Sequence, residues 1–253
     1  MPSLNAITAF LDRELKPSQF KDISHNGLQV ENSGKVRKVC VGVDASMDFF
    51  EAANAQGADL LICHHGISWG DSLARITAQN YPRVKYLLEH DMALYASHLP
   101  LDAHAELGNN ACIAKALGVR TLHPFGNYHG VNIGCTGRLP RALAYAALKG
   151  ELATLFGGSP YVSMDFGKET IRTVAIVSGG AADLAEEAAQ KNVDLYITGE
   201  PMLQTYSIAK EYGLNVFFGG HYATETFGVR ALAEAISNKF SIPAEFINLS
   251  VPY

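Results

Sequence analysis

Continuous apolar runs alternate with amphipathic segments along this chain, and the alternation predicts strands and helices in turn. The run 38–43 is apolar after its first residue and ends at Asp44, and the run 58–63 is also mostly apolar. Between them, residues 47–56 place apolar side chains at helical spacing. Short apolar runs of this kind are typical of strands that a parallel sheet buries on both faces. Residues 36–66 are therefore predicted to form a right-handed β-α-β unit.

Helical spacing recurs in other segments of the chain. Residues 3–16 carry apolar side chains on one helical face, and Pro17 ends that pattern. Further helices are predicted over residues 103–117, 141–155 and 223–237. The region 123–140 is rich in glycine and weakly periodic, so we expect it to join two parts of the chain.

The segment Val39–Gly66 resembles a second segment, Val174–Pro201, when the two are aligned without a gap. The identical pairs are Val39 and Val174, Asp48 and Asp183, Glu51 and Glu186, Ala53 and Ala188, Asp59 and Asp194, Leu60 and Leu195, and Ile62 and Ile197. Because the strand-helix-strand pattern also matches, we infer an internal duplication. In this register His65 corresponds to Glu200.

The repeat extends to two histidines that are each followed by a carboxylate four residues later. His98 precedes Asp102 in this way, and His221 precedes Glu225. The offset is 135 residues between Val39 and Val174 but 123 between His98 and His221, so the first half carries 12 additional residues. We place them in Ile67–Arg83, which contains the only tryptophan, and expect this segment to serve assembly or to cover a cavity.

Composition and charge argue against some classes of function. The chain has 253 residues, of which 48% are hydrophobic and 18% charged, with a net charge of −5. This balance gives no reason to expect nucleic acid as a partner, and no apolar run approaches the ~18 residues of a membrane span. The four cysteines are widely spaced, so buried free thiols are expected. With no signal-peptide pattern at its start, the protein is expected to be cytoplasmic.

The second apolar run ends in two adjacent histidines, His64 and His65. Neighbouring side chains on a regular strand point to opposite faces, so the two can converge only where the strand gives way, and Gly66 supplies that break. Open α/β sheets place ligands beyond the carboxyl ends of their strands, and imidazole is a common metal ligand. A histidine pair at a strand end is also found as an ordinary surface pair, and only further ligands favour a metal.

Further ligands are available elsewhere in the chain. The candidate metal ligands are His64, His65, Asp102, His221 and Glu225. Three imidazoles and two carboxylates exceed what one catalytic zinc takes from a protein, but they suit two metal ions ~3.5–4 Å apart. Both carboxylates are expected at the positive ends of helices. For His221, a polar residue at a helix-entry turn remains an equal alternative.

The candidate ligands come from both halves of the predicted repeat. We expect an α/β fold of two pseudo-symmetric β-α-β lobes with a metal site between them. The N-terminal lobe is expected over residues 1–125 and the C-terminal lobe over residues 126–253. The chain contains neither the HExxH nor the GxSxG motif of two common hydrolase classes. Gly179-Gly180 follows a predicted strand, where such a pair can hold an anion, but it does not fit a nucleotide-loop spacing, so no cofactor other than metal ions is expected.

A set of short motifs resembles one family across nearly the whole chain. The motifs are Asn26-Gly27-Leu28-Gln29-Val30, Gly42-Val43-Asp44, His64-His65-Gly66, His98 through Asp102, Gly108-Asn109-Asn110, Thr198-Gly199-Glu200, and Gly220-His221 with Thr224-Glu225. Together they resemble the GTP cyclohydrolase 1 type 2 homologues, which are related to NGG-interacting factor three. The resemblance implies a toroidal homohexamer of two-lobed subunits. It also implies two divalent metal ions, such as Fe, Zn or Mn, on the five ligands named above.

The family name implies action on GTP, although nothing in the sequence indicates a purine pocket. Our leading hypothesis is a metal-dependent hydrolase of a nucleotide-like or other small substrate, in which the two ions activate a water molecule. His98 and Glu200 are the candidate catalytic groups that move protons, with orientation of the metal ligands as the alternative role. The competing hypothesis is a hexameric scaffold or metal-handling protein without catalysis.

Overall fold

The computed structural model describes residues 1–158, 161–249 and 251, and in it the chain forms two compact units. The first unit comprises Met1–Leu101 and the chain from Gly228 through the last strand, and the second comprises Asp102–Phe227. The fold is α/β, as expected. The units differ from the expected lobes 1–125 and 126–253 in two respects: residues 102–125 belong to the second unit, and the end of the chain returns to the first sheet.

The first unit is built on a five-stranded sheet of order β1-β4-β3-β2-β11. Its strands are β1 (Gly27–Val30), β2 (Val39–Asp44), β3 (Leu60–His65), β4 (Ala93–Ala96) and β11 (Ala244–Phe246). β11, β2, β3 and β4 are parallel, and β1 pairs antiparallel with β4 at the edge. The apolar runs of the sequence are thus the buried central strands, and the β2-α2-β3 unit confirms the prediction for residues 36–66.

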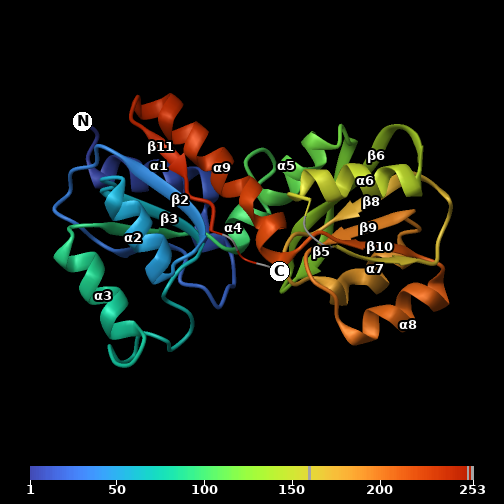
Figure 1. Ribbon diagram of the computed structural model, residues 1–253, viewed down its shortest axis with the longest axis horizontal. Helices are drawn as coiled ribbons and strands as arrows, with labels where there is room; N and C mark the ends of the chain where they lie inside the picture. The colour runs from blue at the N-terminus through green and yellow to red at the C-terminus, as the bar shows by residue number, and fades with distance from the viewer. Residues whose placement is uncertain (159–160, 250, 252–253) are drawn as a thin grey trace. The chain divides into compact units, whose positions relative to one another are not determined.

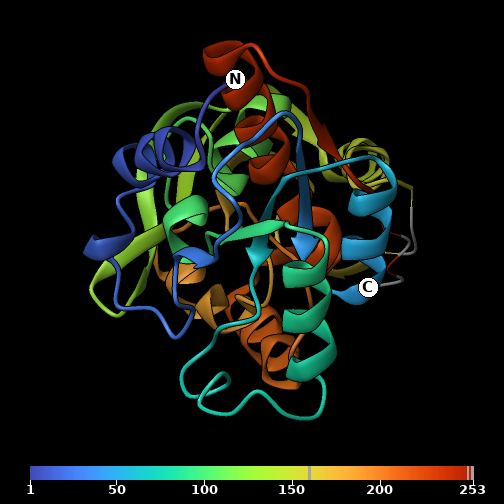
Figure 2. The ribbon, with the colours of Figure 1, turned by 90° about the vertical axis from the view of Figure 1, so that its left-hand side faces the viewer.

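Helices cover both faces of this sheet. They are α1 (Leu4–Leu15), α2 (Met47–Ala55), α3 (Asn80–Glu89), α4 (Leu99–Asp102) and, from Gly228 onward, α9 (His221–Phe240), with the short 3-10 turn η1 (Pro17–Gln19). Figures 1 and 2 show α2 and α3 on one side and α1 on the other. Phe49 and Phe50 of α2 and Leu87 of α3 pack on Cys40 and Leu61, and all five are fully buried.

The second unit contains a six-stranded sheet of order β5-β6-β8-β9-β10-β7. Its strands are β5 (Arg120–Tyr128), β6 (Val131–Ala144), β7 (Val162–Asp165), β8 (Thr170–Ile176), β9 (Leu195–Thr198) and β10 (Asn215–Phe218). β8, β9 and β10 are parallel, and β5, β6 and β7 pair antiparallel.

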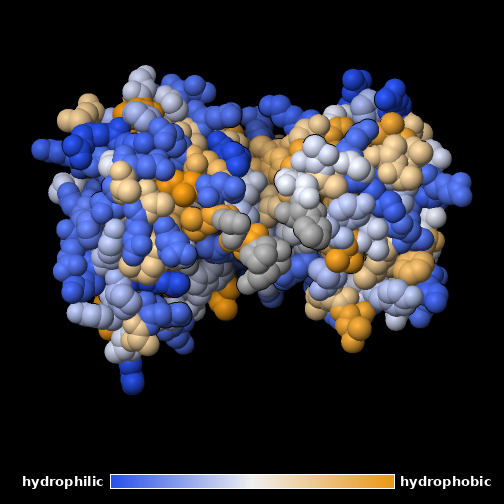
Figure 3. All heavy atoms as spheres, viewed as in Figure 1, coloured by the Kyte–Doolittle hydropathy of each residue, from blue (hydrophilic) through white to orange (hydrophobic). Residues whose placement is uncertain are grey.

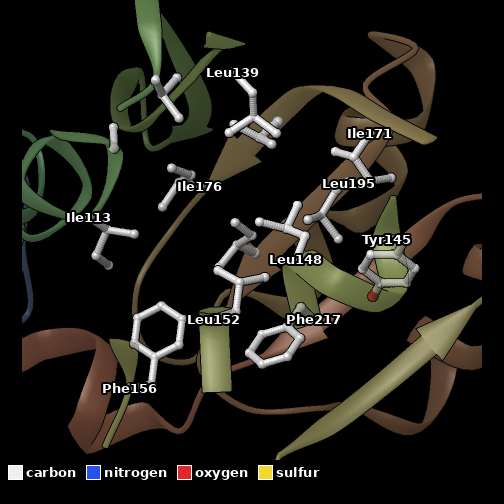
Figure 4. Close-up of a cluster of buried hydrophobic side chains, with 14 residues drawn as sticks. Ile113, Leu139, Tyr145, Leu148, Leu152, Phe156, Ile171, Ile176, Leu195 and Phe217 are labelled. Atoms are coloured by element: carbon white, nitrogen blue, oxygen red, sulfur yellow. The ribbon is translucent and has the colours of Figure 1, made fainter. Parts of the chain in front are cut away.

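The helices of the second unit also lie on both faces of its sheet (Figure 1). They are α5 (Asn109–Ala116), α6 (Tyr145–Leu155), the 3-10 turn η2 (Ala182–Leu184), α7 (Ala185–Gln190) and α8 (Leu203–Tyr212), and α9 (His221–Phe240) starts in this unit. Figure 4 shows Leu148 and Leu152 of α6 among Ile176, Leu195 and Phe217 of the strands. This apolar cluster fixes the sheet whose strand ends carry the polar residues described below.

The residues that the internal repeat equates also pair in the same way in the two sheets. β2 pairs with β3 through Val39 and Leu60, and β8 pairs with β9 through Val174 and Leu195, which are the residues that the sequence alignment equates. The turn η2 with α7 covers residues 182–190, and α2 covers the matching residues 47–55. Each sheet therefore contains three neighbouring parallel strands, β2, β3 and β4 in the first and β8, β9 and β10 in the second.

Two aspartates have the same role in the two units. Asp59 Oδ2 accepts the N–H groups of Arg37 and Lys38 at 2.7 and 3.3 Å. Asp194 Oδ2 accepts those of Arg172 and Thr173 at 2.9 and 2.8 Å, and these donors lie 135 residues after Arg37 and Lys38, the offset of the aligned segments. Burial alone would raise the pKa of Asp194, but hydrogen bonds from Lys168, Thr173 and Arg172 outweigh it and lower the pKa.

Asp194→Asn is expected to destabilise the protein by about 1–3 kcal/mol, because an amide N–H₂ would face backbone donors that need an acceptor. The lowered pKa means that the wild-type advantage is full above about pH 4 and declines as the pH falls through the folded-state pKa. Urea unfolding at pH 7 and pH 3 measures both effects. The exposed Asp183→Asn is the control and should change stability by less than about 0.5 kcal/mol; equal losses at Asp183 and Asp194 would contradict the assignment.

The predicted linker at 123–140 is wrong, because these residues form the long β5–β6 hairpin. Its turn is His129-Gly130, where both residues have positive φ. Glycine recurs in it because the strands pack closely: a Cβ at Gly134 would overlap Ile176 O, and one at Gly137 would lie 2.9 Å from Arg120 O. Close packing explains Gly134 and Gly137, and the positive φ of the turn explains Gly130.

Three predicted helices have different boundaries in the structure. The helix predicted over 141–155 begins at Tyr145, because residues 141–144 continue β6 and pair with β8. The helix predicted over 103–117 is the shorter α5, which begins at Asn109. The helix predicted over 223–237 extends to His221–Phe240.

On the face in Figure 3, hydrophobic side chains lie among polar and charged ones. Leu203 is 91% exposed, and its neighbours Met202 and Tyr206 are 40% and 49% exposed. Among the described residues, no helix has the length and apolar character to cross a bilayer.

Candidate metal centre

His64 and His65 end β3, and their rings lie close together, with centroids 4.7 Å apart. Gly66 follows them at a place where a side chain cannot fit: a Cβ there would lie 2.6 Å from Ala96 Cβ and even nearer to Gln29. The Gln29 side chain uses that space to accept the N–H of Ile67 at 2.9 Å. The strand thus ends before Gly66 as expected, and glycine is needed there because Gln29 and Ala96 approach its backbone closely.

A hydrogen bond orients each of these two rings. His64 Nδ1 lies 2.9 Å from the carbonyl oxygen of Ser97, and His65 Nδ1 lies 2.8 Å from Asp44 Oδ1. A carbonyl oxygen only accepts, so His64 Nδ1 carries the proton, and the Asp44 carboxylate sets the same arrangement for His65. In both rings Nε2 is then the nitrogen with a lone pair for a metal ion.

His98 joins the same cluster from the loop after β4. Its Nδ1 lies 3.0 and 3.1 Å from the two carboxylate oxygens of Asp22. The ligand atoms of His64, His65 and His98 all lie within 4.8 Å of one another, so these three side chains could hold a metal ion. Burial alone would raise the pKa of Asp22, but the hydrogen bond and charge of His98, with bonds from Asn26 and Ser24, lower it to about 2.

Trp69, in the additional segment Ile67–Arg83, packs beside this cluster. Its ring centroid lies 5.1 Å from that of His98, edge to face, and 5.7 Å from that of His65. Its indole Nε1 donates to Gly66 O at 2.7 Å, which fixes the ring. The segment thus places one aromatic ring beside the histidines.

In the second unit, Asp102 is held by hydrogen bonds rather than by a helix dipole. It is the last residue of α4, so the expectation of a position before a long helix is wrong. Asn109 Nδ2 donates to Asp102 Oδ1 at 2.9 Å, and Ser178 Oγ donates to the same oxygen at 3.0 Å. Both donors are buried, which leaves Oδ2 as the oxygen that these two bonds do not use.

His221 lies between two carboxylates at the start of α9. Its Nδ1 is 3.2 Å from Glu200 Oε1, and its Nε2 is 3.1 Å from Glu225 Oε1. The bond with Glu225 raises the pKa of His221 most, burial opposes the rise, and Glu200 adds to it, so that the pKa reaches about 9. Glu225 lies in the second turn of α9, so the expected benefit from the helix start is not found.

Gly179 packs directly against Glu225 and His221. Its φ is +68°, and a Cβ there would overlap Glu225 Oε1 and lie 3.2 Å from His221 Nε2. Its N–H donates to Thr224 Oγ1 at 3.0 Å, and its carbonyl oxygen accepts the Gly199 N–H at 2.9 Å. The end of β8 therefore positions Asp102 through Ser178 and makes room for Glu225 through Gly179.

The sequence prediction included most of these side chains and omitted some of their partners. Within the first unit the structure brings His64, His65 and His98 together, and within the second it brings His221, Glu225 and Glu200 together. The omitted residues are Asp22, Asp44, Ser178 and Asn109. Of these four, Asp44 could have been identified from the pattern of predicted strands, because it ends the strand next to β3 and pairs with His65.

The chain is similar to known proteins over its whole length. A curated protein from Archaeoglobus fulgidus, described as a GTP cyclohydrolase 1 type 2 homolog, is 44% identical over 247 residues, which is 98% of each chain. A Deinococcus radiodurans protein of the same description is 43% identical over 96% of this chain and 91% of its own length.

Solved structures agree with these relatives. The structure titled protein ybgI, of unknown function, has 34% sequence identity and a TM-score of 0.92 over 99% of this chain and 100% of its own. A protein from Thermus thermophilus has 36% identity and a TM-score of 0.89 with the same coverage. The family model of Duf34/NIF3, NGG1p interacting factor 3, matches residues 2–251. The chain therefore belongs to the Duf34/NIF3 family.

Proposed function

We propose that this protein binds two divalent metal ions and uses them to hydrolyse a nucleotide-like or other small substrate. The proposed ligands are His64, His65, Asp102, His221 and Glu225, and the proposed ions are Fe, Zn or Mn. One observation carries the proposal: His64 and His65 both direct Nδ1 to an oxygen acceptor, which is the arrangement that prepares Nε2 for a metal. Such hydrogen bonds accompany nearly all metal-binding histidines.

The donor set of the second unit fits the same ions. Glu225 is 4% exposed in its side chain and Asp102 is buried, and buried carboxylates favour a positively charged partner. In the metal-free chain His221 has a carboxylate at each ring nitrogen, so it holds a proton that a metal ion would displace. Carboxylate oxygens are hard ligands and imidazole nitrogens are intermediate ones. A set of these ligands binds Zn, Fe and Mn better than it binds soft ions that prefer thiolate ligands.

The proposed reaction assigns proton transfer to two residues of this chain. When bound, the ions would supply a nucleophile from water near pH 7 and polarise the bond that is attacked. His98 would take up and return the proton from a position beside His64 and His65. Glu200, whose side chain is 47% exposed, would exchange protons with solvent.

The relatives are described as GTP cyclohydrolase 1 type 2 homologs, so GTP is the first substrate to test. Purified, metal-loaded protein should convert GTP or another compound in a panel of nucleotides and small metabolites, followed by mass spectrometry. Conversion must disappear when the metal is removed by chelation. If no compound in the panel is converted by a preparation with full metal content, the alternative of a metal-binding scaffold or metal-handling protein is favoured.

Metal content is the direct test of the site. Elemental analysis of protein loaded with Mn, Fe or Zn should give close to two ions per chain, since five ligands are shared between two positions. His64→Ala and Glu225→Ala should each lower the content, and His90→Ala, at an exposed histidine whose ring lies against Tyr86, should not. One tightly bound ion, or none, would contradict the dinuclear proposal.

We also propose that the protein assembles as a toroidal homohexamer, as the family resemblance implies. The exposed apolar side chains of Met202, Leu203 and Tyr206 are the kind that subunit contacts bury. Light scattering at micromolar concentration should give six times the mass of the chain. A monomer mass under those conditions would contradict the assembly but not the metal site.

A further inference from the structure

Asp22 lies in the loop between η1 and β1, and its carboxylate is surrounded by hydrogen-bond donors. The side chain is only 3% exposed. Oδ1 accepts the N–H of Ser24 at 3.1 Å, and Oδ2 accepts the N–H of Leu99 at 3.1 Å and the Asn26 amide at 2.8 Å. Each of these three groups is a donor in its bond, so the carboxylate acts only as an acceptor.

The fourth partner of Asp22 is the imidazole of His98. Because both carboxylate oxygens lie within 3.1 Å of Nδ1 and can only accept, Nδ1 must carry the proton. In neutral His98 the lone pair is then on Nε2. Free imidazole can carry its proton on either nitrogen, so this choice is made by the protein.

Asn26 fixes the backbone of the same residue. Its Oδ1 accepts the His98 N–H at 2.7 Å, while its amide group donates to Asp22. Trp69 packs edge to face against the ring from another side. Ring, backbone and tautomer are therefore each restrained by a different group of the first unit.

We propose that Asp22 is a positioning residue that holds His98 as the Nδ1–H tautomer, so that Nε2 serves as the proton acceptor of the reaction. This inference rests on the hydrolytic function proposed above. His98 Nε2 takes a proton from the attacking water, the oxygen of that water forms its bond to the substrate, the bond between the substrate and its leaving group breaks, and the proton passes from Nε2 to that leaving group. Asp22 remains an anion throughout and stabilises the imidazolium.

The tautomer can be measured without substrate or metal. Long-range ¹H–¹⁵N correlation spectra of the metal-free protein, with His98 assigned through His98→Gln, should show protonated Nδ1 and unprotonated Nε2 for neutral His98. Asp22→Asn should shift His98 toward the Nε2–H tautomer, since the new amide can present a donor to Nδ1. Asp12→Asn is the matched control: Asp12 accepts the Tyr95 hydroxyl at 2.8 Å, and this variant should leave the His98 signals unchanged.

In the metal-loaded enzyme, Asp22→Asn should lower kcat 10²- to 10⁴-fold, and Asp12→Asn should not. If Asp22→Asn does not fold, Asp22→Ser removes the carboxylate without adding an amide and is measured in the same way. A lower melting temperature with an unchanged His98 tautomer would assign Asp22 a structural role only and overturn the proposal. Failure to bind metal would overturn the proposed function instead, while the tautomer result would stand.

Discussion

Gly179→Ala is expected to disrupt the metal site of the second unit, lowering the metal content of the loaded protein from two ions per chain to one or fewer. The new Cβ would overlap Glu225 Oε1, and Glu225 is almost fully buried, so its carboxylate has no room to move away. The backbone cannot shift easily either, because Thr224 and Gly199 hold Gly179 from both sides. Alanine at a φ of +68° also costs about 1–2 kcal/mol.

The neighbouring Gly180→Ala is the matched control for this variant. Its Cβ would lie 3.0 Å from Glu200 Oε1, but the Glu200 side chain is 47% exposed and can rotate into solvent. We expect Gly180→Ala to keep both ions and most of the stability. Elemental analysis and thermal unfolding of the two variants measure the difference, and equal metal content in both would refute the role given to Gly179.

The central strands were predictable because burial on both faces requires continuous apolar runs. Val39 to Val43 and Leu60 to Cys63 have no alternation, so the pattern itself indicated a parallel sheet. The repeat was visible for a related reason. Asp59 and Asp194 are identical because each caps the amide groups at the start of a neighbouring strand.

The β5–β6 hairpin was missed because glycine is common both in flexible linkers and in strands that pack closely. Glycine-rich sequence is typical of linkers, but Gly134 and Gly137 sit where a neighbouring chain segment leaves no space for a Cβ. Nothing local distinguishes these cases. The distinction depends on the strands that lie alongside, which the sequence does not reveal.

The candidate ligands were predictable and their partners were not. His64 and His65 follow an apolar strand directly, which is a local pattern. Asp22 and His98 are 76 residues apart, and so are Asp102 and Ser178. A loop aspartate has many ordinary roles, so only the fold identifies the one that faces a histidine. The dipole argument for Asp102 failed because α5 begins only at Asn109, and side chains of Asn109 and of the distant Ser178 hold the carboxylate instead.

His98→Gln and His221→Gln are expected to affect different properties of the enzyme. His98→Gln should keep both metal ions and the assembly while lowering turnover of the identified substrate 10²- to 10⁴-fold, the usual contribution of a general acid or base. His221→Gln should lose metal and activity together, because His221 is a proposed ligand whose ring is held by Glu200 and Glu225. Elemental analysis and steady-state kinetics on the same preparations separate the two effects.

The outcome matters because the geometry allows a second role for His98. Its ligand atom lies within 4.8 Å of those of His64 and His65, as a third imidazole ligand would require. Yet six protein ligands on two ions would leave fewer open positions for water and substrate, which catalysis needs. If His98→Gln loses a metal ion as readily as His221→Gln, then His98 is a ligand and this division of roles is wrong. If turnover is unchanged with both ions retained, His98 is structural, and the proton carrier is to be sought at Glu200.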